Sequence, residues 1–79
     1  MKTISGVTLT LTHDQALVLF EWLSREDERG SIPIQHHAEQ KVLWEIEAQL
    51  ERTLLEPLQS DYSAVIAVAR ERVVSSSGA

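Results

Sequence analysis

Residues 7–12 show a strict alternation of apolar and polar residues. Val7, Leu9 and Leu11 alternate with threonines in the stretch VTLTLT. A period of two in β-favouring residues is typical of a half-buried β-strand. The pattern therefore predicts one short N-terminal strand. No later segment repeats it, so the partner of this strand is the first question that the sequence raises.

The alternation gives way to a helical pattern at Thr12. Thr12 and Gln15 have the spacing of a capping box, in which the threonine hydroxyl accepts from the main-chain N–H three residues later. We expect a helix over residues 13–28, ended by Gly30 in the left-handed conformation. Its apolar positions are Ala16, Leu19, Phe20 and Leu23, widened by Val18 and Trp22. This wide apolar surface predicts the core helix of the fold, with Trp22 in the core.

A second helix is predicted over residues 36–56, where Pro57 ends it. Its helical wheel shows two apolar sectors, whereas a surface helix normally shows one stripe. The main sector holds Val42, Leu43, Ile46, Leu50 and Leu54. The other holds Trp44, Ala48 and Leu55. Two sectors predict contacts in two directions, with the first helix on one side and with a third helix or a second molecule on the other.

The last helix is predicted over residues 61–74, because Tyr62, Ile66, Ala69 and Val73 fall on one stripe. Residues 1–74 are then a single helical domain, and residues 75–79 a flexible C-terminal tail. The expected fold class is mainly α, with a short N-terminal strand followed by three helices.

Composition narrows the function classes. The 79 residues contain no cysteine, which excludes disulfides and thiolate chemistry. Seven basic and twelve acidic residues give a net charge of −5, which argues against nucleic acid and against an anionic membrane surface. No apolar run approaches the roughly 20 residues of a membrane span. We expect a cytoplasmic protein whose small core, contributing about 3–5 kcal/mol, favours association with a partner.

Candidate chemistry is sparse. His36 and Glu39 have the i, i+3 spacing of a helical metal pair, but no third ligand accompanies them, and we interpret them as a polar first helical turn without a metal. The sequence lacks a glycine-rich phosphate loop and a nucleophile motif, so we predict a non-enzyme without a cofactor. Four acids form either a solvated face or a docking face for a basic partner: Glu45, Glu47, Glu51 and Glu56.

Three stretches carry a resemblance: ALVLFEWLSR, AEQKVLWEIEAQLE and LLEPLQSDY. Together they resemble a type of short bacterial reading frame that similarly opens with an alternating strand and a helix with an LFxWL-like core. The resemblance spans most of the chain. It implies a bacterial origin and a single β-α-α-α unit, and it implies no activity, cofactor or site residue.

The unpaired strand leads to the functional prediction, because an exposed strand edge is a template for another polypeptide. Its partner is a stub strand at Ile32 and Ile34, the same strand of a second copy, or a strand of a different protein. We favour a homodimer that acts as a protein–protein interaction or regulatory module of the antitoxin, immunity or adaptor kind. The alternative is a DNA-binding dimer of the ribbon-helix-helix type. The predicted interface residues are Val7, Leu9, Leu11, Trp44, Ala48 and Leu55.

Overall fold

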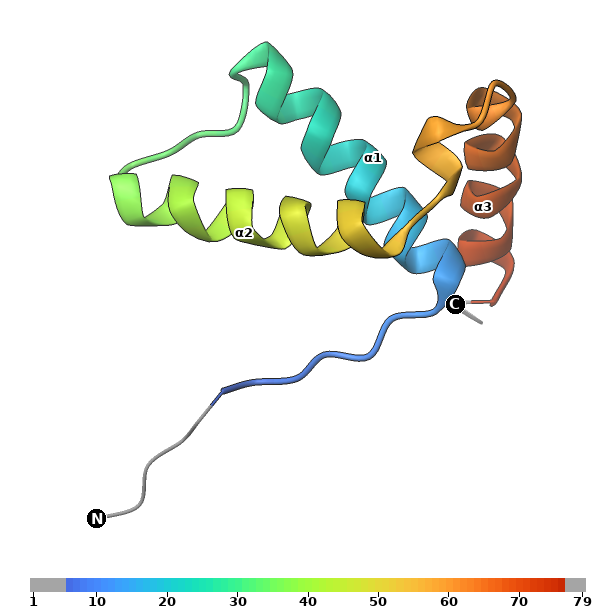
Figure 1. The fold of residues 1–79 in the computed structure, drawn as a ribbon, viewed down its shortest axis with the longest axis horizontal. Coiled ribbons are helices and arrows are strands. Elements are labelled where there is room, and N and C mark those ends of the chain that lie inside the picture. Colours follow the sequence, from blue (N-terminus) through green and yellow to red (C-terminus); the bar gives the residue numbers. More distant parts are fainter. Residues whose placement is uncertain (1–5, 77–79) are drawn as a thin grey trace.

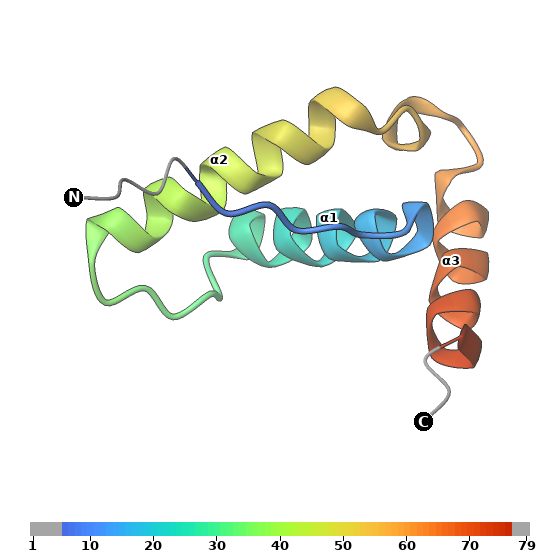
Figure 2. The ribbon, with the colours of Figure 1, turned by 90° about the horizontal axis from the view of Figure 1, so that it is seen from below.

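The computed structural model describes residues 6–76, and within them the chain forms three α-helices. These are α1 (His13–Arg29), α2 (His37–Thr53) and α3 (Tyr62–Ser76), with a short 3-10 helix, η1 (Glu56–Leu58), between α2 and α3. The first two helices lie side by side and run in roughly opposite directions (Figures 1 and 2). The third crosses them near the start of α1 and the end of α2. The prediction of a mainly helical fold is confirmed.

Local sequence signals set both ends of α1. The Gln15 main-chain N–H donates to the Thr12 hydroxyl at 3.1 Å, and the Thr12 N–H donates to the Gln15 side chain at 2.9 Å. At the other end, Gly30 has a φ of 66°, a left-handed conformation that favours glycine. Its N–H donates to the Asp27 carbonyl at 3.0 Å. The capping box and the glycine stop are therefore confirmed as predicted.

The second helix ends three residues earlier than predicted. Leu54 adopts extended geometry, with φ −92° and ψ 136°, and its side chain is buried. Pro57 lies in η1 and not directly after α2. The chain leaves the helix at Leu54 because this turn places the leucine in the core. Leu55 consequently lies beyond α2, so it does not extend the helical face that holds Trp44 and Ala48.

The core lies where α1, α3 and the end of α2 meet. Its central cluster consists of Leu17, Phe20, Leu54, Ile66 and Ala69. The buried stripe of α1 runs through Leu17, Phe20 and Leu23, and Trp22 faces away from it with 48% of its surface exposed. The prediction of Trp22 as a core residue is wrong, because α2 and α3 cover only one side of α1.

The predicted N-terminal strand is absent, since residues 6–76 contain no β-strand. Residues 6–12, which we call the N-terminal arm, have no regular secondary structure and extend away from the helices (Figure 1). The loop with Ile32 and Ile34 forms no strand either. The alternation correctly describes which side chains are apolar. However, a strand requires a hydrogen-bonded neighbour, and the described part of the chain provides none, so this element of the predicted fold class is corrected.

The C-terminal helix continues two residues past its predicted end, through Ser76. Of the predicted tail, residues 75 and 76 are thus helical, and residues 77–79 lie outside the described part of the chain, as do residues 1–5 of the predicted domain. None of the helices over residues 6–76 combines the length and the apolar character needed to cross a membrane.

Candidate functional site

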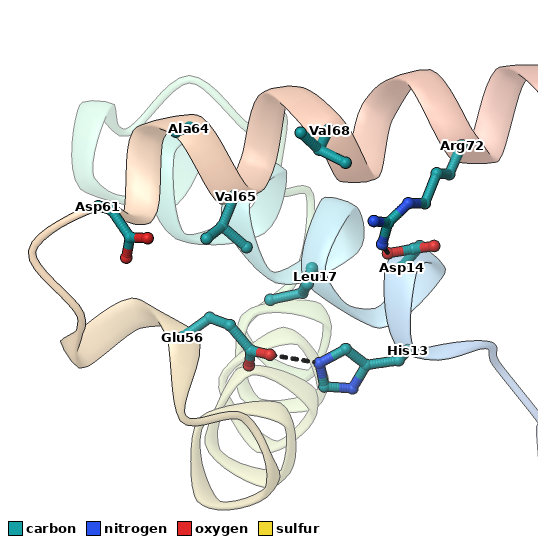
Figure 3. Close-up of a pocket in the computed structure, with 9 residues that line it drawn as sticks. All are labelled: His13, Asp14, Leu17, Glu56, Asp61, Ala64, Val65, Val68 and Arg72. Atoms are coloured by element: carbon teal, nitrogen blue, oxygen red, sulfur yellow. Dashed lines mark hydrogen bonds and ion pairs between the residues drawn. The ribbon is translucent and has the colours of Figure 1, made fainter.

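A shallow cleft of about 320 Å³ lies between the start of α1, η1 and the inner face of α3 (Figure 3). One side of its lining is apolar, and the rest carries ionisable groups. The lining residues are His13, Asp14, Leu17, Glu56, Asp61, Ala64, Val65, Val68 and Arg72. Both acidic and basic groups therefore meet at this corner of the molecule.

The capping box of α1 positions the first two of these groups. Because Thr12 fixes where the helix begins, His13 and Asp14 occupy its first turn, beside η1 and α3. His13 Nε2 lies 2.6 Å from Glu56 Oε2 (Figure 3). This contact joins residues that are 43 positions apart in the sequence. It connects the start of α1 to η1.

Electrostatics support the same connection. The hydrogen bond from His13 is the main reason why the pKa of the Glu56 carboxyl lies below its usual range. Stability from this carboxylate is therefore present above the ordinary carboxyl pKa and is lost as the pH falls through the lowered one. A second connection is the ion pair between Arg72 Nη1 and Asp14 Oδ1 at 3.4 Å, which joins the last turns of α3 to α1.

The polar contacts of the cleft connect the start of α1 to η1 and to α3. Glu56 orients the His13 imidazole as a carboxylate does in many histidine sites. Among the described residues, no serine, threonine, cysteine or lysine lines the cleft. Nor do residues 6–76 contain a group of three histidine or acidic side chains arranged to hold a metal ion.

The candidate metal pair of the sequence serves as a helix cap. His36 precedes α2, and its Nδ1 accepts from the Ala38 main-chain N–H at 3.0 Å. Glu39 reaches back, and its Oε1 accepts from the main-chain N–H groups of Gln35 and His36 at 2.8 and 3.3 Å. This is a capping box with histidine at the N-cap position. The polar first turn expected here has this specific structural role.

The predicted interface residues occupy three separate places. Val7, Leu9 and Leu11 lie on the N-terminal arm and are exposed. On α2, Trp44 is half exposed and Ala48 is half buried. Leu55 is exposed in the connection that follows α2. The structure thus gathers three of the six residues on one extended segment and does not join the other three into one helical face.

The predicted acidic face is also divided. Glu56 belongs to the cleft, and Glu45 forms an ion pair with Arg52 at 3.7 Å. Glu47 is turned towards α1, where burial and the nearby Asp27 carboxylate raise its pKa. Glu51 is exposed. These four acids do not present a single continuous surface to a partner.

A second polar cluster lies at the opposite end of α1 from the cleft. Asp27 accepts from Gln40 Nε2 and from Trp44 Nε1, each at 3.2 Å, and Glu47 lies beside them on α2. Sequence reasoning missed this cluster and the cleft. Each joins residues from different elements, and nothing in the sequence pattern fixes how those elements are placed against one another.

Comparison with protein families, with curated proteins and with solved structures finds no match for this chain. The resemblance to short bacterial reading frames, and the origin that it implies, stay predictions.

Proposed function

We propose that the chain is a small, acidic, non-catalytic protein–protein interaction or regulatory module, of the antitoxin, immunity or adaptor kind, and that its N-terminal arm is the binding element. One observation carries the proposal. Val7 is 86% and Leu9 is 81% exposed. No main-chain hydrogen bond of residues 6–11 is present within the described part of the chain. The arm therefore offers both apolar side chains and open peptide groups.

Such a segment suits pairing with another polypeptide. In extended conformation, Val7, Leu9 and Leu11 would share one side while the threonines occupy the other. A partner strand would satisfy the open N–H and C=O groups and cover the apolar side. In such a complex, the alternating residues would form the half-buried strand that they do not form in the isolated chain.

The favoured partner is a second copy, in a symmetric dimer in which the two arms pair antiparallel. The support is energetic. The core cluster contains only five buried residues, and α2 contributes no buried residue within its own bounds. A domain this small gains substantially from additional buried surface. Trp44 and Leu55, which are also exposed, are further candidates for the same interface.

Light scattering tests the proposal on the full chain at micromolar concentration. The parent protein is expected to show twice the mass of one chain. Leu9→Asp places a charge on the apolar side of the arm and is expected to give the monomer. Thr10→Asp adds the same charge on the other side, and this matched control is expected to remain a dimer. A parent that stays monomeric throughout contradicts the dimer, and equal effects of the two variants contradict the role of the apolar side.

DNA binding is the other outcome to be distinguished. The described arm contains no lysine or arginine to contact phosphates, and the acidic balance of the chain opposes an anionic partner. We therefore expect no change in fluorescence anisotropy when labelled mixed-sequence duplex is titrated with the protein at low salt. Binding under these conditions would favour the ribbon-helix-helix alternative over the interaction module.

A further inference from the structure

The contact between the C-terminal half of α1 and α2 includes one carboxylate that accepts two hydrogen bonds. Asp27 Oδ1 accepts from Gln40 Nε2 and Asp27 Oδ2 accepts from Trp44 Nε1, each at 3.2 Å. Within residues 6–76, Asp27 forms no ion pair with a basic side chain. Both of its oxygens are thus held by neutral donors, and both donors come from α2.

A second carboxyl group shares this site. Glu47 lies three residues after Trp44 on α2, and its Oε1 is buried without a hydrogen-bond partner. The charged groups that act on Glu47 are Asp27, on the helix packed against it, and Glu51, on its own helix. Both are acidic. A buried carboxylate oxygen without a donor is costly, and two neighbouring carboxylates resist being ionised together.

We propose that Asp27 and Glu47 form a pH-sensitive clamp, in which one proton shared by the two carboxyl groups holds α2 against α1 and loss of that proton loosens the contact. With the proton on Glu47, its O–H donates to the ionised Asp27, which keeps its bonds to Gln40 and Trp44. When the proton leaves for solvent, two negative carboxylates face each other with no cation between them. The α1–α2 contact then weakens, and Trp44 becomes more exposed to water.

The direction of the pH effect follows from the environment of Glu47. Burial raises its pKa, and the Asp27 carboxylate raises it further. The folded chain therefore keeps a proton that the unfolded chain has already released. The stability contributed by the clamp is complete below the ordinary carboxyl pKa and is lost as the pH rises through the raised pKa of Glu47.

Other acids act in the opposite direction. Hydrogen bonds lower the pKa of Glu26, beside Ser31, and of Glu56, beside His13. Their contributions are lost as the pH falls. The pH profile of the parent protein is therefore a sum of opposing effects. The contribution of the clamp is therefore obtained by subtracting the pH profile of a Glu47 variant from that of the parent protein.

The experiment follows Trp44 in the full chain with Trp22→Phe as background, so that one tryptophan remains. The emission maximum and the denaturant midpoint are measured between about pH 4 and pH 8. In this parent, the emission maximum is expected to move to longer wavelength as the pH rises. With Glu47→Gln added, the shift is expected to disappear, because the amide is neutral and can donate at every pH. At the upper end of the range, this variant should also unfold at higher denaturant concentration than the parent.

Two controls separate the clamp from its surroundings. Glu51→Gln removes an exposed acid one turn further along α2, and the wavelength shift is expected to persist. The His37 ring lies 6.5 Å from the Trp44 ring in an edge-on contact, so this ring can also affect the emission. His37→Gln removes that ring, and the shift is again expected to persist. Loss of the shift in either control, or its retention in Glu47→Gln, overturns the proposal.

A direct titration keeps the proposal testable even if Glu47→Gln does not fold. Carboxyl carbon resonances of the parent, followed by NMR against pH, are expected to show Glu47 titrating above the other glutamates. Its midpoint should fall towards the ordinary range in Asp27→Asn, because the neighbouring negative charge is gone. An ordinary midpoint for Glu47 in the parent overturns the clamp.

Discussion

The two halves of α1 make different kinds of contact. Its N-terminal half packs Leu17 and Phe20 against α3 and Leu54 in the central cluster of the core. Its C-terminal half contributes the buried Leu23, and beyond it Asp27 accepts hydrogen bonds from two polar side chains of α2. Apolar burial is indifferent to pH and has no strict geometry, whereas the polar contact depends on charge and on donor placement. One helix thus makes an apolar contact that is indifferent to pH and a polar contact that depends on charge.

The largest effect is expected from a comparison of two isoleucines, one in the core cluster on α3 and one on α2. Ile66 on α3 is 3% exposed and Ile46 on α2 is 38% exposed. We expect Ile66→Ala to cost about 2–5 kcal/mol, which would leave much of so small a domain unfolded. The matched Ile46→Ala is expected to cost about 1 kcal/mol or less. Denaturant unfolding measures both, and equal losses would remove the distinction between the two sides.

The next effect concerns the start of α1, on which the cleft depends. Thr12→Ala removes the hydroxyl that accepts from the Gln15 N–H. We expect a loss of about 1 kcal/mol in the free energy of unfolding. Thr10→Ala is the control, because Thr10 lies in the exposed arm and has no hydrogen bond to another residue of 6–76. An unchanged unfolding midpoint for Thr12→Ala would mean that the core alone fixes where α1 begins.

A smaller effect on stability is expected when the ion pair at the N-terminal end of α1 is removed. The Arg72 side chain, which forms the ion pair with Asp14, is 65% exposed to solvent. Surface ion pairs contribute little, so we expect Arg72→Ala to cost less than about 0.5 kcal/mol. A loss as large as that of Ile66→Ala would show that charge, as well as apolar burial, stabilises the contact between α1 and α3.

The smallest effect at neutral pH is expected from Tyr62, whose contribution changes only at high pH. Burial raises the pKa of Tyr62 to about 12, and the nearby Glu21 carboxylate adds to this. The folded chain keeps the phenol proton that the unfolded chain begins to lose near pH 10. Stability from this group is therefore expected to fall as the pH rises from about 10 towards 12. The ultraviolet absorbance of this single tyrosine follows the titration directly, and an ordinary midpoint would mean that Tyr62 is open to water in solution.

How far the sequence predicts this structure depends on the range of the interactions involved. The ends of α1 are predicted correctly because Thr12, Gln15 and Gly30 act on their immediate neighbours. The end of α2 is not, because Leu54 leaves the helix in order to enter the core. The alternation in the arm identifies its apolar side chains, but whether they form a strand depends on a partner that the described chain does not contain.

Both polar clusters lie outside what such patterns can predict. Joining His13 to Glu56 requires the position of η1 relative to α1, and joining Asp27 to Trp44 requires the register of two helices. The sequence shows all of these residue types. The partners that meet in the two clusters are far apart in the chain, whereas His36 and Glu39 have the regular i, i+3 spacing of a helical pair. Those two residues cap α2, whereas the groups that meet across elements carry no periodic signal.

The absence of buried residues within α2 has a consequence for how the molecule opens. Local opening needs little energy where few apolar groups must be exposed to water. Leu54, directly after the helix, is the buried residue that attaches it to the core. We therefore expect α2 to unfold and refold as a separate unit while α1 and α3 stay folded. Its amide hydrogens should exchange with deuterated solvent well before those of the other two helices.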